Sequence, residues 1–334
     1  MRLAYVARRV GLFFAVILAA ATLNFFLPRI SGQDPVREKL MQQAAATGSV
    51  QTGIEEMVEE YQREFGLDQP LWRQYLTYLS DVAQLDFGYS IANYPRTVAS
   101  ILSYALPWTI GLLLTTTILG FVIGTLAGAL LAWPRSPGFI QYLFPPLLTL
   151  SAIPFFLLGL VLIYLFAFRV HWFPLFGGYT PGTFPGLNPT FVLDVLKHSV
   201  LPALSILLAS LGFWALGMRG MMVSVEGEDY MTFAESTGLK DRTLFFTFAL
   251  RNALLPQTTA LGLSLGQLLS GALLVEVIFS FPGIGSVLYN AIRQFDFFLI
   301  QGIVFTIVLG VTLATLILDL IYPLLDPRIT YQRG

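Results

Sequence analysis

Cysteine is absent from this sequence of 334 residues, which excludes disulfide bonds, thiolate nucleophiles and cysteine-ligated metal sites. Histidine is nearly absent: His171 and His198 stand far apart in the sequence, and we expect loop or interfacial residues rather than metal ligands. Charge is scarce as well, because 12% of the residues are Asp, Glu, Lys or Arg, against about 25% in an ordinary soluble domain. The net charge of -1 argues against nucleic acid as a partner.

The chain also lacks the residues that common catalytic sites need. A phosphate-binding loop requires a lysine that follows a glycine, and none of Lys39, Lys197 and Lys240 does so. The HExxH motif of zinc proteases is missing too. We therefore expect no catalytic residue, no bound cofactor and no metal site on this chain. If ATP powers its function, another polypeptide hydrolyses that ATP.

What the chain has in abundance is apolar sequence. Hydrophobic residues make up 55% of it, and the mean hydropathy is +0.70. This composition predicts an all-α integral membrane protein, and long apolar segments predict six transmembrane helices. The segments are roughly Val10–Leu27, Tyr104–Trp133, Gly138–Phe168, Val200–Met218, Asn252–Val275 and Phe297–Tyr322. The first resembles a signal peptide, but no small-residue cleavage site follows it, so we expect a retained span.

Basic residues in the short loops predict the orientation, because they concentrate on the cytoplasmic side. Ten of them share a side with the N-terminal tail: Arg2, Arg8, Arg9, Arg135, Arg219, Lys240, Arg242, Arg251, Arg328 and Arg333. The other side has three: Arg169, Lys197 and Arg293. Both termini are therefore expected in the cytoplasm. The chain divides into residues 1–28 (tail and first span), 29–103 (external loop) and 104–334 (five-helix core with a cytoplasmic segment, 219–256).

The external loop is expected to form a small helical cap. Ile54–Phe65 has apolar residues at helical spacing and ends before Gly66, and Leu71–Val82 has the pattern of a second amphipathic helix. The acidic residues of this loop are interpreted as a solvated face rather than a ligand site.

The interiors of the six segments contain almost no ionisable residue, since Glu276 and Asp319 lie near segment ends. Ion-coupled carriers place such residues within the membrane, so a secondary transporter is disfavoured. Rows of small residues at four-residue spacing allow helices to approach closely, either within one subunit or against a second. One row is Gly120, Gly124 and Gly128, and another is Gly262, Gly266 and Ser270.

A charged segment with short amphipathic helices, Glu228–Pro256, separates two of the apolar segments. We expect Ser224 to cap a helix that presents Tyr230, Phe233, Ala234 and Thr237 on one face, and Gly238 to end it in a left-handed conformation. A second helix, from Leu244 to Leu250, should lead into the next span. Such a segment either docks a cytoplasmic protein or lies on lipid headgroups, although its acidic start is unusual for a lipid-binding helix.

Several motifs in order resemble the permease subunits of binding-protein-dependent ABC importers, specifically the oligopeptide/dipeptide branch. They are FGLDQPL (65–71), LDFGYS (85–90), AESTGL (234–239), ALRNALLP (249–256), GALLVEVIFSFPGIG (271–285) and LDPR (325–328). The resemblance implies the type I importer permease fold and a "coupling" segment that contacts an ATPase. Two departures stand out, since Thr232 replaces the glutamate of that segment and Glu235 replaces a common basic residue.

The resemblance implies these partners: a second homologous permease, two ATPase subunits that carry ATP and magnesium, an external solute-binding protein, and membrane lipid. It places the chain in a bacterial or archaeal inner membrane. The residues expected to couple to the ATPase are Tyr230, Phe233, Ala234, Glu235, Gly238, Leu239, Arg251 and Pro256. Residues at the outer end of the fifth span either line or gate the pathway, or form a structural turn. These are Glu276, Phe279, Phe281, Pro282 and Gly283.

Cargo is the least determined property. The resemblance favours peptides, while related machines import oligosaccharides or metal chelates, and the external cap keeps an oligosaccharide open. The alternative from another class is a membrane scaffold or receptor whose charged segment recruits a cytoplasmic protein. A secondary carrier comes third.

Overall fold

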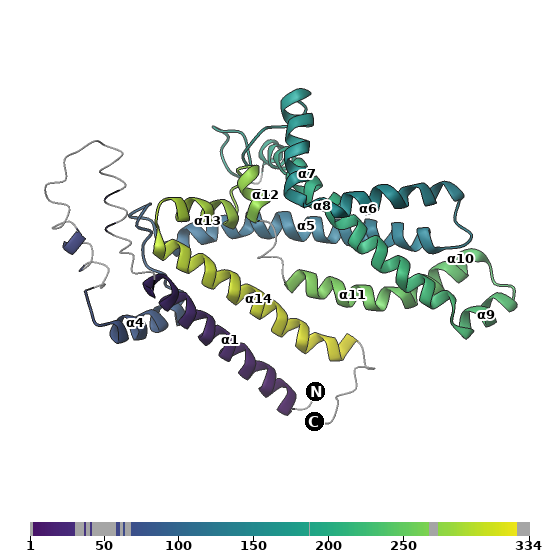
Figure 1. The fold of residues 1–334 in the computed structure, drawn as a ribbon, viewed down its shortest axis with the longest axis horizontal. Helices are drawn as coiled ribbons and strands as arrows, with labels where there is room; N and C mark the ends of the chain where they lie inside the picture. Colours follow the sequence, from purple (N-terminus) through teal and green to yellow (C-terminus); the bar gives the residue numbers. More distant parts are fainter. Residues whose placement is uncertain are drawn as a thin grey trace. The chain divides into compact units, whose positions relative to one another are not determined.

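The computed structural model describes residues 3–30, 37, 41, 58–60, 63, 68–186, 188–266 and 273–325. Within these ranges the chain is helical, apart from turns and one isolated bridge between Tyr89 and Thr97 (Figure 1). This confirms the all-α prediction. The predicted helix at Ile54–Phe65 lies mostly outside the described residues. The helix predicted at Leu71–Val82 is present as α4, Leu71–Ala83.

Among the described residues, four helices are long and apolar enough to cross a membrane: Ala4–Leu27, Val98–Ala132, Pro189–Glu226 and Phe297–Ile321. A fifth crossing requires the pair Gly138–Ala152 and Phe155–Arg169, which bends by 102°. The bend follows from Pro154, which has no backbone N–H to continue the first helix and caps the second. The remaining predicted span, Asn252–Val275, includes residues outside the described ranges, so the count of six stays a prediction.

The chain forms two compact units. The first comprises Met1–Trp108 and Gly283–Pro323, and the second comprises Thr109–Pro282 and Leu324–Gly334. The first and last spans therefore belong to the same unit although they lie at opposite ends of the sequence.

The first unit is built around α1 (Leu3–Ile30), α13 (Ile284–Arg293), α14 (Phe297–Leu325) and the beginning of α5 (Val98–Ala132). Polar contacts join α1 to α14: Arg9 pairs with Asp319 at 2.9 Å, and Asn24 donates to the Gln301 carbonyl at 2.9 Å. Asp296 is fully buried just before α14 and accepts hydrogen bonds from the Ser90 hydroxyl and the Ala92 amide. This carboxylate therefore fixes the segment before α5 against the start of α14.

The helix α13 was not expected from the sequence. Its buried residues, Ile284 and Ala291, lie at helical spacing, and they pack with Leu102 of α5 and Ile303 of α14. That spacing is the signal that could have revealed it, but the segment is short and follows a proline-glycine turn.

The second unit is organised around α8 (Pro189–Glu226), a helix of 38 residues against which α6 (Phe144–Ala152), α7 (Phe155–Leu162) and α11 (Arg251–Gly266) pack. The remaining elements described in this unit are η1 (Gly138–Leu143), η2 (Ile163–Arg169), α9 (Asp229–Ser236), α10 (Asp241–Thr243), η3 (Leu244–Leu250) and α12 (Leu273–Ile278).

The predicted row of Gly120, Gly124 and Gly128 faces α8 within the second unit. A Cβ on Gly124 would lie 2.5 Å from the Trp214 Cβ and 2.9 Å from the Leu211 carbonyl oxygen, so a larger residue would push the helices apart. This row therefore packs within the subunit. The second row ends at Ser270, outside the described residues.

Candidate functional site

The charged segment begins later than the sequence suggested. α8 continues to Glu226, and the Ser224 hydroxyl donates to the Gly220 carbonyl at 3.2 Å inside that helix. The predicted capping role of Ser224 is therefore wrong. The residue before α9 is Glu228, in extended conformation, and Asp229 opens the helix. An acidic residue in the first turn suits the positive end of the helix dipole.

The end of α9 is as predicted. Gly238 has φ of +72°, in the left-handed region, and its amide donates to the Glu235 carbonyl at 3.0 Å. No heavy atom lies within 4 Å of a Cβ built on Gly238. The requirement for glycine at this position therefore comes from backbone conformation and not from lack of space.

The chain then continues into α11 without a break in the helix. After α10, η3 is a π-helix, and α11 follows it directly at Arg251. This confirms the predicted helix at Leu244–Leu250, although its wider π geometry was not anticipated. Arg251 and Pro256 are both exposed on α11. A continuous helix thus joins the segment after α10 to the predicted fifth span.

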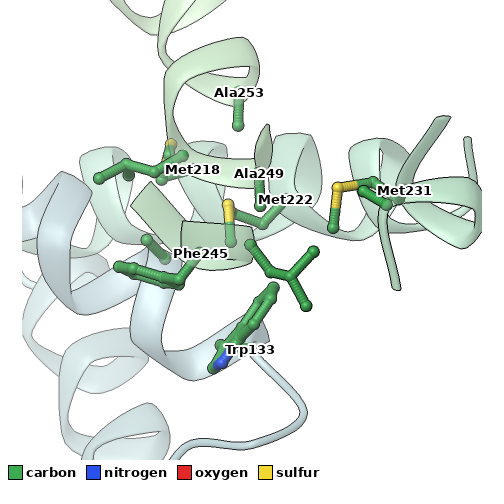
Figure 2. Close-up of a cluster of buried hydrophobic side chains, with 11 residues drawn as sticks. Trp133, Met218, Met222, Met231, Phe245, Ala249 and Ala253 are labelled. Atoms are coloured by element: carbon green, nitrogen blue, oxygen red, sulfur yellow. The ribbon is translucent and has the colours of Figure 1, made fainter. Parts of the chain in front are cut away.

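α9 is seated on a buried cluster of apolar side chains, which we call the methionine cluster (Figure 2). Five elements of the second unit and the residue after α5 contribute to it. Its members are Ala129, Trp133, Met218, Met222, Met231, Ala234, Leu244, Phe245, Ala249, Leu250 and Ala253. Trp133 and Phe245 meet edge to face, with ring centroids 5.3 Å apart. Apolar burial of this kind is the main force that holds α9 against α8 and η3.

The rotation of α9 about its axis differs from the predicted one. Met231 and Ala234 point into the cluster, with 2% and 3% of their surface exposed. Phe233 is 71% exposed, and Tyr230 and Leu239 are exposed by 37% and 39%. Ala234 therefore lies beneath the outer face, which corrects the expectation that it contacts a partner directly. Met231 was missed, and its spacing of three residues from Ala234 is the signal that marked the inner face.

Tyr230 is held at the edge of this face. Burial of its ring raises the pKa of the phenol, a hydrogen bond with the Asn252 side chain opposes that rise, and nearby Glu228 adds to it. Asn252 in turn donates to the Phe248 carbonyl at 2.7 Å. The hydroxyl thus links α9 to the beginning of α11.

Arg135, in the loop after α5, holds both sides of the turn at Gly238. Its guanidinium lies 3.4 Å from Glu235 and 3.4 Å from Asp241, and it stands 5.5 Å from the centre of the Trp133 ring. The unusual glutamate at position 235 therefore has a basic partner from a distant part of the sequence. All three charged side chains are well exposed, so each pair stabilises the fold only slightly.

A cavity of about 360 Å³ lies next to these ion pairs, lined by Trp133, Pro134, Arg135, Glu226, Met231 and Glu235. The buried Oε1 of Glu226 has no hydrogen-bond partner within the described structure. Across the described ranges, no group of three or more His, Asp or Glu side chains is placed to hold a metal ion.

The residues predicted at the outer end of the fifth span are mostly buried. Glu276 is 1% exposed and accepts a hydrogen bond from the Thr109 hydroxyl at 2.7 Å. Phe279 and Phe281 are each 2% exposed, and the Phe279 ring packs against Gly159 of α7. Pro282 and Gly283 follow in the turn before α13. This burial agrees with the structural alternative, in which the turn is fixed and the glutamate is satisfied internally.

Comparison with known proteins gives a consistent result. Residues 120–331 match the family described as "Binding-protein-dependent transport system inner membrane component". The chain is 36% identical over 332 residues to the probable peptide ABC transporter permease protein y4tP of Sinorhizobium fredii, covering 98% of this chain and 99% of the relative.

Two further relatives are similar over their whole length. The di/tripeptide transport system permease protein DppB of Pseudomonas aeruginosa is 33% identical over 344 residues, covering 99% of this chain and 100% of the relative. The oligopeptide transport system permease protein AppB of Bacillus subtilis is 33% identical over 331 residues, covering 98% and 99%. With its apolar helices, type I permease fold and full-length similarity, the chain belongs to the family of inner-membrane permease components of binding-protein-dependent ABC transporters.

Proposed function

We propose that this chain is the permease subunit of an ATP-driven peptide importer and that Tyr230, Phe233 and Leu239 form the face on which an ATPase docks. The observation that carries the proposal is the exposed Phe233 on a short helix whose opposite side is buried. A large aromatic side chain that is exposed on a firmly seated helix is suited to fill a pocket on another protein.

Motion of the ATPase would pass along two routes. Glu235 and Gly238 keep the turn after α9 in one conformation, and the methionine cluster carries displacement of α9 to α8. The continuous helix from η3 through Arg251 to Pro256 would carry it to the fifth span. The mechanism is alternating access by rigid-body movement. Glu276, Phe279, Phe281, Pro282 and Gly283 would then move as a packed unit at the outer end of that span.

The assembly requires other chains. We propose a second homologous permease, two ATPase subunits with ATP and magnesium, and an external solute-binding protein, in a bacterial inner membrane with both termini in the cytoplasm. The excess of basic residues on the side of Arg135, Lys240 and Arg242 supports this orientation. The segment 219–256 would be the cytoplasmic coupling region.

Peptides are the proposed cargo, because the relatives named above are peptide, di/tripeptide and oligopeptide permeases. Uptake of a labelled dipeptide into vesicles with the complete importer tests this. Competition by unlabelled di- and tripeptides supports the proposal. Competition by oligosaccharides but not by peptides would overturn the cargo assignment and leave the permease role intact.

The docking face is tested with Phe233→Ala. We expect the ATPase to co-purify less and ATP-driven uptake to fall, while the chain remains in the membrane. The matched control is Phe184→Ala, since that side chain is 88% exposed in a loop outside the charged segment. Unchanged co-purification and uptake in Phe233→Ala would contradict the proposal.

A further inference from the structure

The helix α4 carries an exposed apolar stripe. Successive residues of a helix are about 100° apart, which places Trp72 and Leu76 within about 40° of each other. Their side chains are 67% and 57% exposed. Arg73 and Thr77 are exposed too, but each lies about 100° further round the helix than Trp72 and Leu76 respectively. α4 thus has a buried side, an apolar exposed side and a polar exposed side.

The buried side is fastened to the end of α1 (Figure 1). The Tyr75 and Thr22 hydroxyls are 2.7 Å apart, and Asn24 donates to the Tyr78 hydroxyl at 3.1 Å. The Phe25 ring of α1 packs against both tyrosine rings in tilted contacts, with ring centroids 5.3 Å from each. These directional contacts fix how α4 is rotated, and so they fix where its apolar stripe points.

The attachment points set the depth of α4. Thr22 and Asn24 lie inside the apolar span Ala4–Leu27, and about 7.5 Å of helix separates Thr22 from Leu27 at 1.5 Å per residue. α4 is therefore attached to α1 within the last turns of the apolar span, rather than beyond its end.

The surface of α1 at this level is apolar and open. Leu23 is 58% exposed and Leu27 is 62% exposed. Only 11% of the 18-residue apolar window of this span is buried within the described chain, so this surface is open. Phe26, beside these leucines, meets Tyr75 of α4 with ring centroids 5.4 Å apart. The open apolar surface of α1 thus reaches α4.

Arg29, at the end of α1, is directed away from the apolar stripe. It lies 3.6 Å over the Phe25 ring, and it donates to the Phe25 carbonyl at 2.9 Å and to the Gln74 side chain at 3.2 Å. Gln74 lies far round the helix from Trp72 and Leu76. Arg29 therefore adds no charge to the apolar stripe, and Arg73 lies on the polar exposed side next to it.

We propose that α4 lies in the membrane interface at the end of α1, with Trp72 and Leu76 inserted among lipid chains and Arg73 and Thr77 in water. Tryptophan is enriched at this boundary because its ring is amphipathic. The bilayer is thereby the partner of the apolar stripe, and α4 is an in-plane anchor that holds the cap at a fixed height. This inference does not depend on the proposed cargo or on ATPase docking.

The absence of native cysteine allows a direct test. Single variants Trp72→Cys, Leu76→Cys, Arg73→Cys and Thr77→Cys are spin-labelled in the full-length chain, in vesicles of phosphatidylcholine and phosphatidylglycerol. Collision rates with oxygen, which dissolves in lipid, and with a nickel chelate, which stays in water, are then compared. We expect the ratio of oxygen to nickel collisions to be several-fold higher at 72 and 76 than at the matched neighbours 73 and 77.

Two results would overturn the proposal. High nickel accessibility at all four positions would place the stripe in water. Low accessibility to both reagents at 72 and 76 would show that protein covers it. Fluorescence of the cysteine-free parent gives an independent measurement: brominated lipids should quench it more than they quench Trp72→Phe, and equal quenching in the two would also contradict the insertion of Trp72.

Discussion

Two short helices, α9 and α4, are each attached to the end of a long span but by different interactions. α9 buries Met231 and Ala234 in an apolar cluster and leaves Phe233 outside. α4 buries Val82, but tyrosine hydroxyls and tilted aromatic contacts attach it to α1. Apolar contacts have little directionality and survive small displacements, whereas hydrogen bonds fail beyond a few tenths of an ångström. The apolar attachment of α9 suits a helix that is displaced when a partner moves it. The hydrogen-bonded attachment of α4 suits a helix that keeps its position.

Of the substitutions that weaken one of these two attachments, a change at Met231 is expected to have the largest effect. Met231→Ala removes a buried side chain from the methionine cluster and should destabilise the seat of α9 by about 2–5 kcal/mol. Hydrogen exchange of the α9 amides should become much faster. Phe233→Ala removes a larger but exposed side chain from the same helix, and the exchange rates should hardly change. Equal acceleration by both variants would show that the two faces of α9 are wrongly assigned.

Gly238→Val comes second. A β-branched residue at a φ of +72° is strained by about 1–2 kcal/mol, and the strain can be relieved only by moving the turn after α9. We expect ATP-driven uptake to be largely lost while the chain stays in the membrane. Gly182→Val is the matched control, because Gly182 has φ of +91° with open space and lies in another loop. The same loss in both variants would mean that general destabilisation is the cause.

Arg135 attaches α9 through exposed ion pairs, which are weaker than the apolar contacts of the methionine cluster next to them. Arg135→Gln and Glu235→Gln should each reduce uptake by about two- to fivefold, the range that an exposed ion pair supplies, and the double variant should be no worse than Arg135→Gln alone, which already loses both ion pairs. The effect should shrink at high salt because the pairs are exposed. Strictly additive losses in the double variant would show that the two side chains act independently.

The smallest expected effect concerns Asp81 on α4. Burial, and then the nearby charge of Asp86, raise the pKa of this carboxyl above its usual value. The folded chain therefore binds the proton more tightly than the unfolded chain, and loses relative stability as pH rises from the ordinary aspartate pKa to the raised one. Asp81→Asn should raise the thermal midpoint slightly at neutral pH but not in acid.

Asp86→Asn removes the neighbouring charge that raises the Asp81 pKa but leaves Asp81 as buried as before. It should therefore raise the thermal midpoint at neutral pH by less than Asp81→Asn does. A larger gain from Asp86→Asn than from Asp81→Asn would reverse the assigned order of causes.

Local features of this chain were predictable from sequence, and features set by distant contacts were not. Gly238 could be identified because a left-handed residue that ends a helix is a property of a few neighbouring residues. The rotation of α9 could not, because Met222 and Phe245 determine it through packing. The partner of Glu235 is Arg135, 100 residues away, and no pattern in one sequence joins them.

The same distinction holds in the membrane-spanning helices. A proline such as Pro154 favours a break in the segment Gly138–Phe168, but the angle of 102° depends on how α6 and α7 pack against α8. The start of α9 was misplaced because Ser224 satisfies its hydroxyl within α8, so a good capping residue is not used as a cap.

Oxidation of the methionine cluster can also be used to measure how often the cluster opens. Met218 and Met222 are fully buried and Met231 nearly so, and the sequence has no thiol to consume an oxidant first. Peroxide can convert the Met218 and Met222 thioethers to sulfoxides only while the cluster is open, and the polar product then disfavours closure. The rate of sulfoxide formation at Met222 thus reports how often the cluster opens, in the native protein and without any attached label.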